Sequence, residues 1–465
     1  MSAPALWIGI PLTMGAVSFL LLSDRTVARA GGITCLMLAL IALIIPIDEA
    51  LLVGPLSIKI ASTASLLGRS LVIPAGESAL LVMLFGLCSM WFFGSEAAGV
   101  ARQLVPAGLV ITGLLIAALA VQPFLYAALM VDIAALAAIP LLAPSGRPPS
   151  RAVVKFLIYQ TLGMPCILLA GWLLAGVETS PGDLALTIQA TVMLSLGFAF
   201  LLAIFPLSDW IPGLMGASHP YVAGFVLWIL PNVILVFGLS FLDNYAWLRT
   251  STQITTGLRV LGLIMLVSSG LAAAVERNLG RLMGHVVIAE TGLTFLAASL
   301  AIATGTNMVF PFFIPRGLGL ILWALALAVA REGYPELTFQ SLGDIGRTRP
   351  WAGAGLVLAS LSAAGFPLLA GFPARIDVWA GLAGVSSASA IWYMLGLAGL
   401  MIGALRMLAQ LLGPRTDEPA VPEETSMQRA MLGAAMVALI GLGLFPRATE
   451  FLVTRFPYMF EHLAR

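Results

Sequence analysis

The sequence predicts an all-α polytopic membrane protein with about 14 transmembrane helices, the seventh and twelfth of which are broken. Three observations support this fold class. Hydrophobic residues make up 60% of the chain and charged residues only 10%, which excludes an ordinary soluble domain. Apolar runs long enough to cross a bilayer recur along the whole chain. Two of these runs are interrupted by proline and glycine.

The apolar runs define the expected membrane spans. They lie at about 4–22, 30–46, 76–94, 104–121, 122–143, 152–176, 185–207, 221–242, 256–275, 284–305, 308–330, 351–372, 387–411 and 428–445. The first run is long and no basic region precedes it, so we expect a retained span rather than a cleaved signal peptide. The longer connection 47–74 has room for a short hairpin.

The two interruptions are the most informative feature of the chain. The first lies at Pro206, and the second contains Gly365, Pro367 and Gly371. In lipid, a helix break leaves backbone N–H and C=O groups without partners, so it persists only where protein or water satisfies them. Broken spans at corresponding positions of two halves are typical of a binding site or ion path in a transporter.

The position of the breaks also predicts the internal organisation. We expect a single membrane domain, 1–465, with two five-helix inverted repeats at about 104–242 and 256–411, each containing one broken span. The tail 447–465 mixes charged and aromatic residues, which is typical of an interfacial helix.

Charge predicts the orientation and limits the partners. Successive loops and span ends lie on alternate sides of the membrane. One side carries fourteen basic residues and the other carries nine. The richer side should face the cytoplasm, which places both termini outside. The net charge is +1 and no basic tract is present, so nucleic acid is not an expected partner, whereas the lipid bilayer is. No set of metal ligands is recognisable, and no metal or other cofactor is expected.

Five stretches resemble a known family. They lie at 131–136, 205–212, 219–220, 278–292 and 365–372. Together they are similar to the antiporter-like membrane subunits of complex I (NADH-quinone oxidoreductase), which are related to Mrp-type antiporter and membrane-bound hydrogenase subunits. The resemblance covers roughly residues 75–445. It implies a multi-pass subunit in the inner (cytoplasmic) membrane that works with other membrane subunits, while quinone chemistry and redox centres belong to those partners.

The chain departs from this family at its key lysines. Family members that pump protons have a Lys in the seventh span, a Lys in the eighth, and a Lys or Glu just after the break in the twelfth. The corresponding positions here are Leu201, Pro231 or Asn232, and Arg375. Leucine cannot carry a proton, and arginine retains its proton at any working pH. We therefore expect the series of proton-carrying groups in the first half to be interrupted.

Ionisable residues at bilayer depth are the candidates for a proton path, because a charge there costs several kcal/mol. They are Asp132, His285, Glu290, Arg316, Arg375 and Asp377. Asp132 stands where the family has a fifth-span Glu, and it is either a remnant of a proton site or a carboxyl satisfied by polar neighbours. Glu290 either lines a water path or belongs to a buried ion pair, for which Arg316 is the expected partner.

Spacing separates the remaining candidates. His285 and Glu290 are five residues apart, so they do not share a helix face. Arg375 and Asp377 are two apart and lie on different faces if helical. We expect these two to form a polar exit or interface rather than a relay.

Three functions are consistent with the sequence. The first is a membrane-arm subunit of a complex I-like oxidoreductase that contributes to proton translocation through a degenerate or partial channel. The second is a non-conducting structural membrane subunit. The third is a cation/proton antiporter or ion-coupled uptake module, because fold does not fix function. No nucleophile–base pair appears in the sequence, so we expect no active site of the chain's own; it would instead be a subunit of a quinone oxidoreductase complex.

Overall fold

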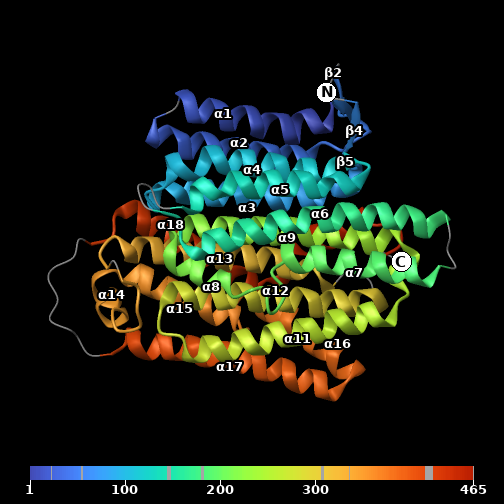
Figure 1. Cartoon of the computed structure of the whole chain (residues 1–465). Helices are drawn as coiled ribbons and strands as arrows, with labels where there is room; N and C mark the ends of the chain where they lie inside the picture. The colour runs from blue at the N-terminus through green and yellow to red at the C-terminus, as the bar shows by residue number, and fades with distance from the viewer. Residues whose placement is uncertain are drawn as a thin grey trace.

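A computed structural model shows an all-α protein whose long helices run roughly parallel to one another (Figure 1). It describes residues 1–465 except 22, 54–55, 67, 144–147, 180–182, 305–307, 335, 414–422 and 464–465. Within the described residues, twelve helices are long and apolar enough to cross a membrane. The N-terminal helix and the broken pair α15 and α16 supply two further crossings. The predicted architecture of about 14 membrane helices is confirmed.

The crossings follow one another closely along the chain. In order they are η1 (Ala5–Gly9) with α1 (Ile10–Leu21), α2 (Asp24–Ile44), α3 (Ser78–Ala97), α4 (Ala101–Ala120), α5 (Ala127–Leu142), α6 (Arg151–Thr179), α7 (Leu184–Leu201), α9 (Pro220–Asn244), α11 (Thr252–Val275), α12 (Leu279–Thr304), α13 (Phe313–Arg331), α15 (Pro350–Ala363) with α16 (Phe372–Val385), α17 (Ser387–Leu411) and α18 (Ser426–Leu444). Three short helices connect them: α8 (Trp210–Ala217), α10 (Ala246–Arg249) and α14 (Leu342–Thr348).

Chain order is largely preserved in space. In Figure 1, α1 and α2 form one edge of the bundle and α17 the opposite edge. The last crossing, α18, instead returns toward the middle of the bundle and packs one face against α3, α13 and α15, while much of its surface stays exposed. The breaks after α7 and α15 fall one in each predicted repeat, 104–242 and 256–411. The inverted relation between these repeats stays a prediction.

Short β-strands cap one end of the bundle beside the N-terminus (Figure 1). Strands β1 (Ala50–Val53) and β2 (Leu56–Lys59) form one antiparallel hairpin, in which Ala50 pairs with Lys59. Strands β3 (Thr63–Leu66) and β4 (Arg69–Val72) form a second, and β5 (Val121–Gln122) adds to β4. The connection 47–74 therefore holds two hairpins where the sequence predicted room for one.

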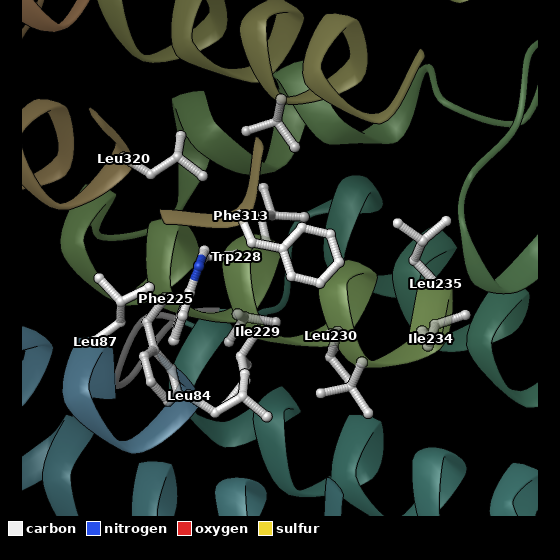
Figure 2. Packing of buried hydrophobic residues seen from close by; sticks show 14 of the residues in the cluster. Leu84, Leu87, Phe225, Trp228, Ile229, Leu230, Ile234, Leu235, Phe313 and Leu320 are labelled. Atoms are coloured by element: carbon white, nitrogen blue, oxygen red, sulfur yellow. The ribbon is translucent and has the colours of Figure 1, made fainter. Parts of the chain in front are cut away.

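The centre of the core lies around α9, which is buried along most of its length. Trp91 of α3 contacts Tyr221 with 4.7 Å between ring centroids, and the Tyr221 hydroxyl donates a 2.8 Å hydrogen bond to the Trp91 carbonyl. Figure 2 shows Phe225 and Trp228 of α9 packed among leucines of α3 and facing Phe313 of α13. This apolar layer joins α3 and α9 of the first half of the chain to α13 of the second.

The C-terminal tail differs from the predicted interfacial helix. Residues 446–459 form only short turns, η6 (Pro446–Thr449), α19 (Glu450–Val453) and η7 (Phe456–Met459), because prolines begin two of them and cannot continue a preceding helix. Phe456 stacks on Phe310 of η5 (Phe310–Phe312) with 4.4 Å between centroids. The Asp243 carboxylate accepts hydrogen bonds from the backbone N–H groups of residues 461–463. These contacts hold the tail against the bundle and bury Phe456, Phe460 and Leu463.

Candidate functional site

The first break separates α7, which ends at Leu201, from α8, which begins at Trp210. Pro206 lies between them, as predicted. The side-chain Nε2 of Gln160 in α6 donates a 3.0 Å hydrogen bond to the Leu201 carbonyl. Lys155 of α6 pairs with Asp209 at the far side of the break. Helix α6 thus satisfies a backbone group that the break would otherwise leave exposed to lipid.

The second break lies between Ala363 of α15 and Phe372 of α16, and Gly365, Pro367 and Gly371 all fall within it. Gly365 has a φ of +79°, a conformation that favours glycine. The Gly371 N–H donates to the Ser362 hydroxyl at 3.3 Å, and the backbone N–H of residue 370 donates to a carbonyl of α18 at 3.1 Å. Protein groups therefore satisfy the backbone at this break as well.

Three charged side chains meet beside the second break. They are Glu290 of α12, Arg316 of α13 and Arg375 of α16, which we call the Arg–Glu–Arg cluster. Each is only 3% to 5% exposed. Nη2 of Arg375 pairs with Oε1 of Glu290, while its Nη1 donates a 2.7 Å hydrogen bond to the Gly371 carbonyl. The cluster brings together side chains from three helices, of which α12 and α13 follow each other closely in the chain and α16 comes later.

The pairing inside this cluster corrects two predictions. Glu290 forms its ion pair with Arg375 rather than with Arg316, whose Nη2 instead donates to the Thr291 hydroxyl at 3.2 Å. Arg375 is consequently buried and does not form a polar exit. The physical reason is the break itself. A Cβ atom at Gly365 would lie 2.8 Å from Cδ of Arg375, so the absent side chain leaves the space through which Arg375 reaches α12.

His285 and Asp377 lie outside the cluster. Nε2 of His285 lies 3.5 Å from the Glu276 carboxylate at the C-terminal end of α11, and Arg281 lies 3.3 Å from the same carboxylate. Burial alone would raise the pKa of Glu276, but backbone hydrogen bonds and these two neighbours lower it below its ordinary value. Asp377 is exposed and lines an open groove of about 370 Å³.

The first half holds isolated polar groups. Asp132 of α5 is 6% exposed, and its Oδ1 has no hydrogen-bond partner among the described residues. Asn232 of α9 is 1% exposed, and within that same described part neither amide atom has a partner. Leu201 is packed so tightly against α6 that a Cβ at Gly163 would lie 2.6 Å from its Cγ. The position at which the resemblance implies a lysine is therefore filled by a buried apolar side chain.

Sequence reasoning missed the polar side chains that support these sites. Gln160, Thr291 and Ser362 each make a hydrogen bond described above. Their common signal is a polar residue within an apolar run. Such residues are frequent in membrane helices, so the signal identifies these three only once the breaks and their neighbours are placed in space.

His219, immediately before α9, provides a pH prediction. Burial, reinforced by Arg331, lowers its pKa to about 4. The unfolded chain should protonate near the ordinary value of about 6.5, so unfolding becomes more favourable as pH falls from 6.5 to about 4 and levels off below. We expect His219→Gln to reduce the loss of thermal stability across this window, with pH 8 as reference. An unchanged pH profile in the variant would contradict the prediction.

The fold and the cluster define a class: polytopic membrane proteins with two broken helices and a buried ion pair beside one of them. Residues 145–403 match the family "NADH:quinone oxidoreductase/Mrp antiporter, TM". The chain belongs to this family.

Named relatives and solved structures agree with the family. NADH-quinone oxidoreductase subunit N of Cereibacter sphaeroides is 29% identical over 313 residues, which span 65% of this chain and 68% of the relative. The same subunit of Cutibacterium acnes is 27% identical over 250 residues, 50% of this chain and 45% of its own length. A chain of the membrane-bound sulfane sulfur reductase, an archaeal respiratory membrane complex, has a TM-score of 0.81 at 15% identity and covers 100% of this chain and 98% of its own. At that identity the likeness shows the fold alone.

Proposed function

We propose that this chain is a membrane-arm subunit of a complex I-like quinone oxidoreductase and contributes to proton translocation through a partial path in its second half. The observation that carries the proposal is Glu290, a carboxylate buried beside a broken helix and paired with Arg375. Ionisable groups inside a membrane are costly and mark ion paths. The family match and the names of the relatives support the assignment.

The roles of the cluster residues follow from their chemistry. Glu290 is the residue that takes up and releases a proton, because a carboxyl group can change charge within the membrane. Arg316 and Arg375 remain charged and bias the path electrostatically. In the first half, the buried Leu201 and the apolar layer around α9 in Figure 2 favour a closed route. We therefore propose a partial path rather than a complete one.

The same proposal covers location and partners. The bias of basic residues supports placement in the inner (cytoplasmic) membrane with both termini outside. Other membrane subunits are the expected neighbours, and the exposed apolar face of α17, which includes Ile391, Trp392 and Met394, is available to lipid or to such a neighbour. Electron transfer and quinone chemistry take place in partner subunits.

A second candidate is a non-conducting structural subunit. It is favoured by Asp132 and Asn232, which have side-chain atoms without hydrogen-bond partners among the described residues. The direct pairing of Glu290 with Arg375 is also consistent with a purely structural role. The two functions differ in whether Glu290 must change charge.

Glu290→Gln separates them. In the intact complex reconstituted into vesicles, we expect this variant to lower the number of protons moved per electron pair, because the amide accepts a hydrogen bond but cannot ionise. Proton uptake and quinone reduction are measured in the same sample. An unchanged proton-to-electron ratio in a fully assembled complex would assign the chain to the structural class.

Two further variants control for assembly. Glu424 is also buried, and its carboxylate accepts the backbone N–H groups of Trp351 and Ala352. We expect Glu424→Gln to affect stability without changing the proton-to-electron ratio. The double variant E290Q/R316M has the same net charge in the cluster as the natural protein, yet still lacks the titratable carboxyl. If the altered charge of Glu290→Gln hinders assembly, the double variant should still assemble. It should then show the same loss of pumping.

A further inference from the structure

The Arg–Glu–Arg cluster carries more positive than negative charge. Two guanidinium groups, Arg316 and Arg375, share a buried space with one carboxylate, Glu290. Across the part of the chain that the structure describes, that carboxylate is in ion-pair contact with Arg375, while Arg316 has no carboxylate within 4.0 Å. A buried charge without compensation costs several kcal/mol. The cluster therefore needs a further negative charge.

A cavity lies where that charge would be most effective. All three side chains line it, together with Ser362 and Gly371. Its volume, about 10 Å³ of space for the centre of a water-sized sphere, accommodates roughly one such sphere. The Nε atoms of Arg316 and Arg375 are both buried without a hydrogen-bond partner among the described residues. The two residues that carry these unpartnered donors thus both line one small cavity.

The chemistry of the cavity selects the ligand. A water molecule would satisfy hydrogen bonds but would leave the excess charge in place. Protonation of Glu290 would increase that excess, and a cation would be repelled by both arginines. A multi-atom anion such as sulfate is too large for the space. A single monatomic anion supplies the missing charge, and because it is slightly larger than water its entry requires a small outward shift of the arginine side chains that line the space.

We infer that the cavity between Arg316 and Arg375 binds one small monovalent anion of the halide class, with chloride as its most available member. The anion neutralises the guanidinium group that Glu290 leaves uncompensated. This inference depends on the charge balance of the cluster with Glu290 ionised, and its test does not require the chain to conduct protons.

Thermal unfolding of the purified complex tests the inference. At constant ionic strength, replacing gluconate with chloride or bromide should raise the Tm of this subunit by about 2 °C or more, since a ligand that binds only the folded state stabilises it. Gluconate is too large for the cavity. A Tm that does not depend on the halide would overturn the inference.

Arg316→Met locates the effect. The variant removes one guanidinium and leaves Glu290 paired with Arg375, so the cluster becomes neutral. We expect its Tm to be independent of halide. Arg349→Met is the matched control, because Arg349 is equally buried but pairs with Glu332 at 3.1 Å; its halide dependence should equal that of the natural protein. A halide effect that persists in Arg316→Met would place the anion elsewhere and refute this site.

Anomalous scattering from bromide-soaked crystals of the natural complex provides a test that needs no variant. A bromide peak within hydrogen-bond distance of the Arg316 and Arg375 guanidinium groups would support the site. A map with no peak at this position, at a bromide concentration that saturates the Tm shift, would refute it.

Discussion

Gly371→Ala should lower the free energy of unfolding by about 3 kcal/mol or more, at the upper end of the range for added volume in a packed interior. The new Cβ would collide with the Ser362 carbonyl oxygen and with Nη1 of Arg375. The carbonyl belongs to the backbone of α15 and cannot rotate away. The arginine is held by its ion pair with Glu290 and by the Gly371 carbonyl. The substitution must therefore either displace the break or expel Arg375 from the cluster.

Gly384→Ala is the matched control for this prediction. Gly384 lies on the same helix, α16, and a Cβ there would meet no atom within 4 Å. Alanine also favours helix more than glycine does, so this variant should be neutral or slightly stabilising. The measurement is the thermal or denaturant unfolding of the purified complex. Equal effects of the two substitutions would show that the close approach at Gly371 is not what limits stability.

Glu290→Leu should be the most destabilising single change of a charged residue in the cluster, at about 3–5 kcal/mol, the usual cost of removing one partner of a buried ion pair. It removes the ion-pair partner of Arg375 and leaves the two buried guanidinium groups, Arg316 and Arg375, in a cavity whose one carboxylate, among the described residues, is gone. Arg316→Met should be far milder, because one positive and one negative charge then remain. The order of these two effects follows from charge balance rather than from the number of hydrogen bonds that each substitution removes.

Glu332→Leu provides the comparison for a less buried pair. Glu332 pairs with Arg349, but its side chain is 45% exposed, compared with 6% for Glu290. Solvent therefore screens the attraction of Glu332 for Arg349, and the buried Arg349 keeps a hydrogen bond to the Val329 carbonyl after the substitution, so the loss of stability should be smaller. Unfolding of the three variants in one buffer with fixed chloride measures the order. If Glu290→Leu proved no more harmful than Glu332→Leu, the cluster would not hold an essential buried charge.

Much of the architecture could be predicted from the sequence. The lengths of the apolar runs predicted about 14 crossings, and Pro206, Gly365, Pro367 and Gly371 located both breaks. Spacing also separated His285 from Glu290 correctly, and the structure places His285 beside Glu276 instead. These features depend on residues close together in the chain, where helix periodicity and the missing N–H of proline act directly.

Contacts between distant segments could not be predicted in the same way. The sequence identified Glu290, Arg316 and Arg375 as costly charges but paired Glu290 with the wrong arginine. The choice depends on the direction in which α16 leaves the second break, and on the space left by Gly365. The C-terminal tail was likewise expected to form a helix, whereas it consists of short turns that Asp243 and Phe310 hold against the bundle.

The sequence by itself determined that this protein spans a membrane many times and where its helices break, because hydropathy and backbone chemistry are local properties. Only the tertiary structure decided which charges meet. It brought two arginines and one glutamate from three separate helices into one buried cavity. That excess of charge is a property of the assembled helices, because the energy of each charge depends on what packing places around it.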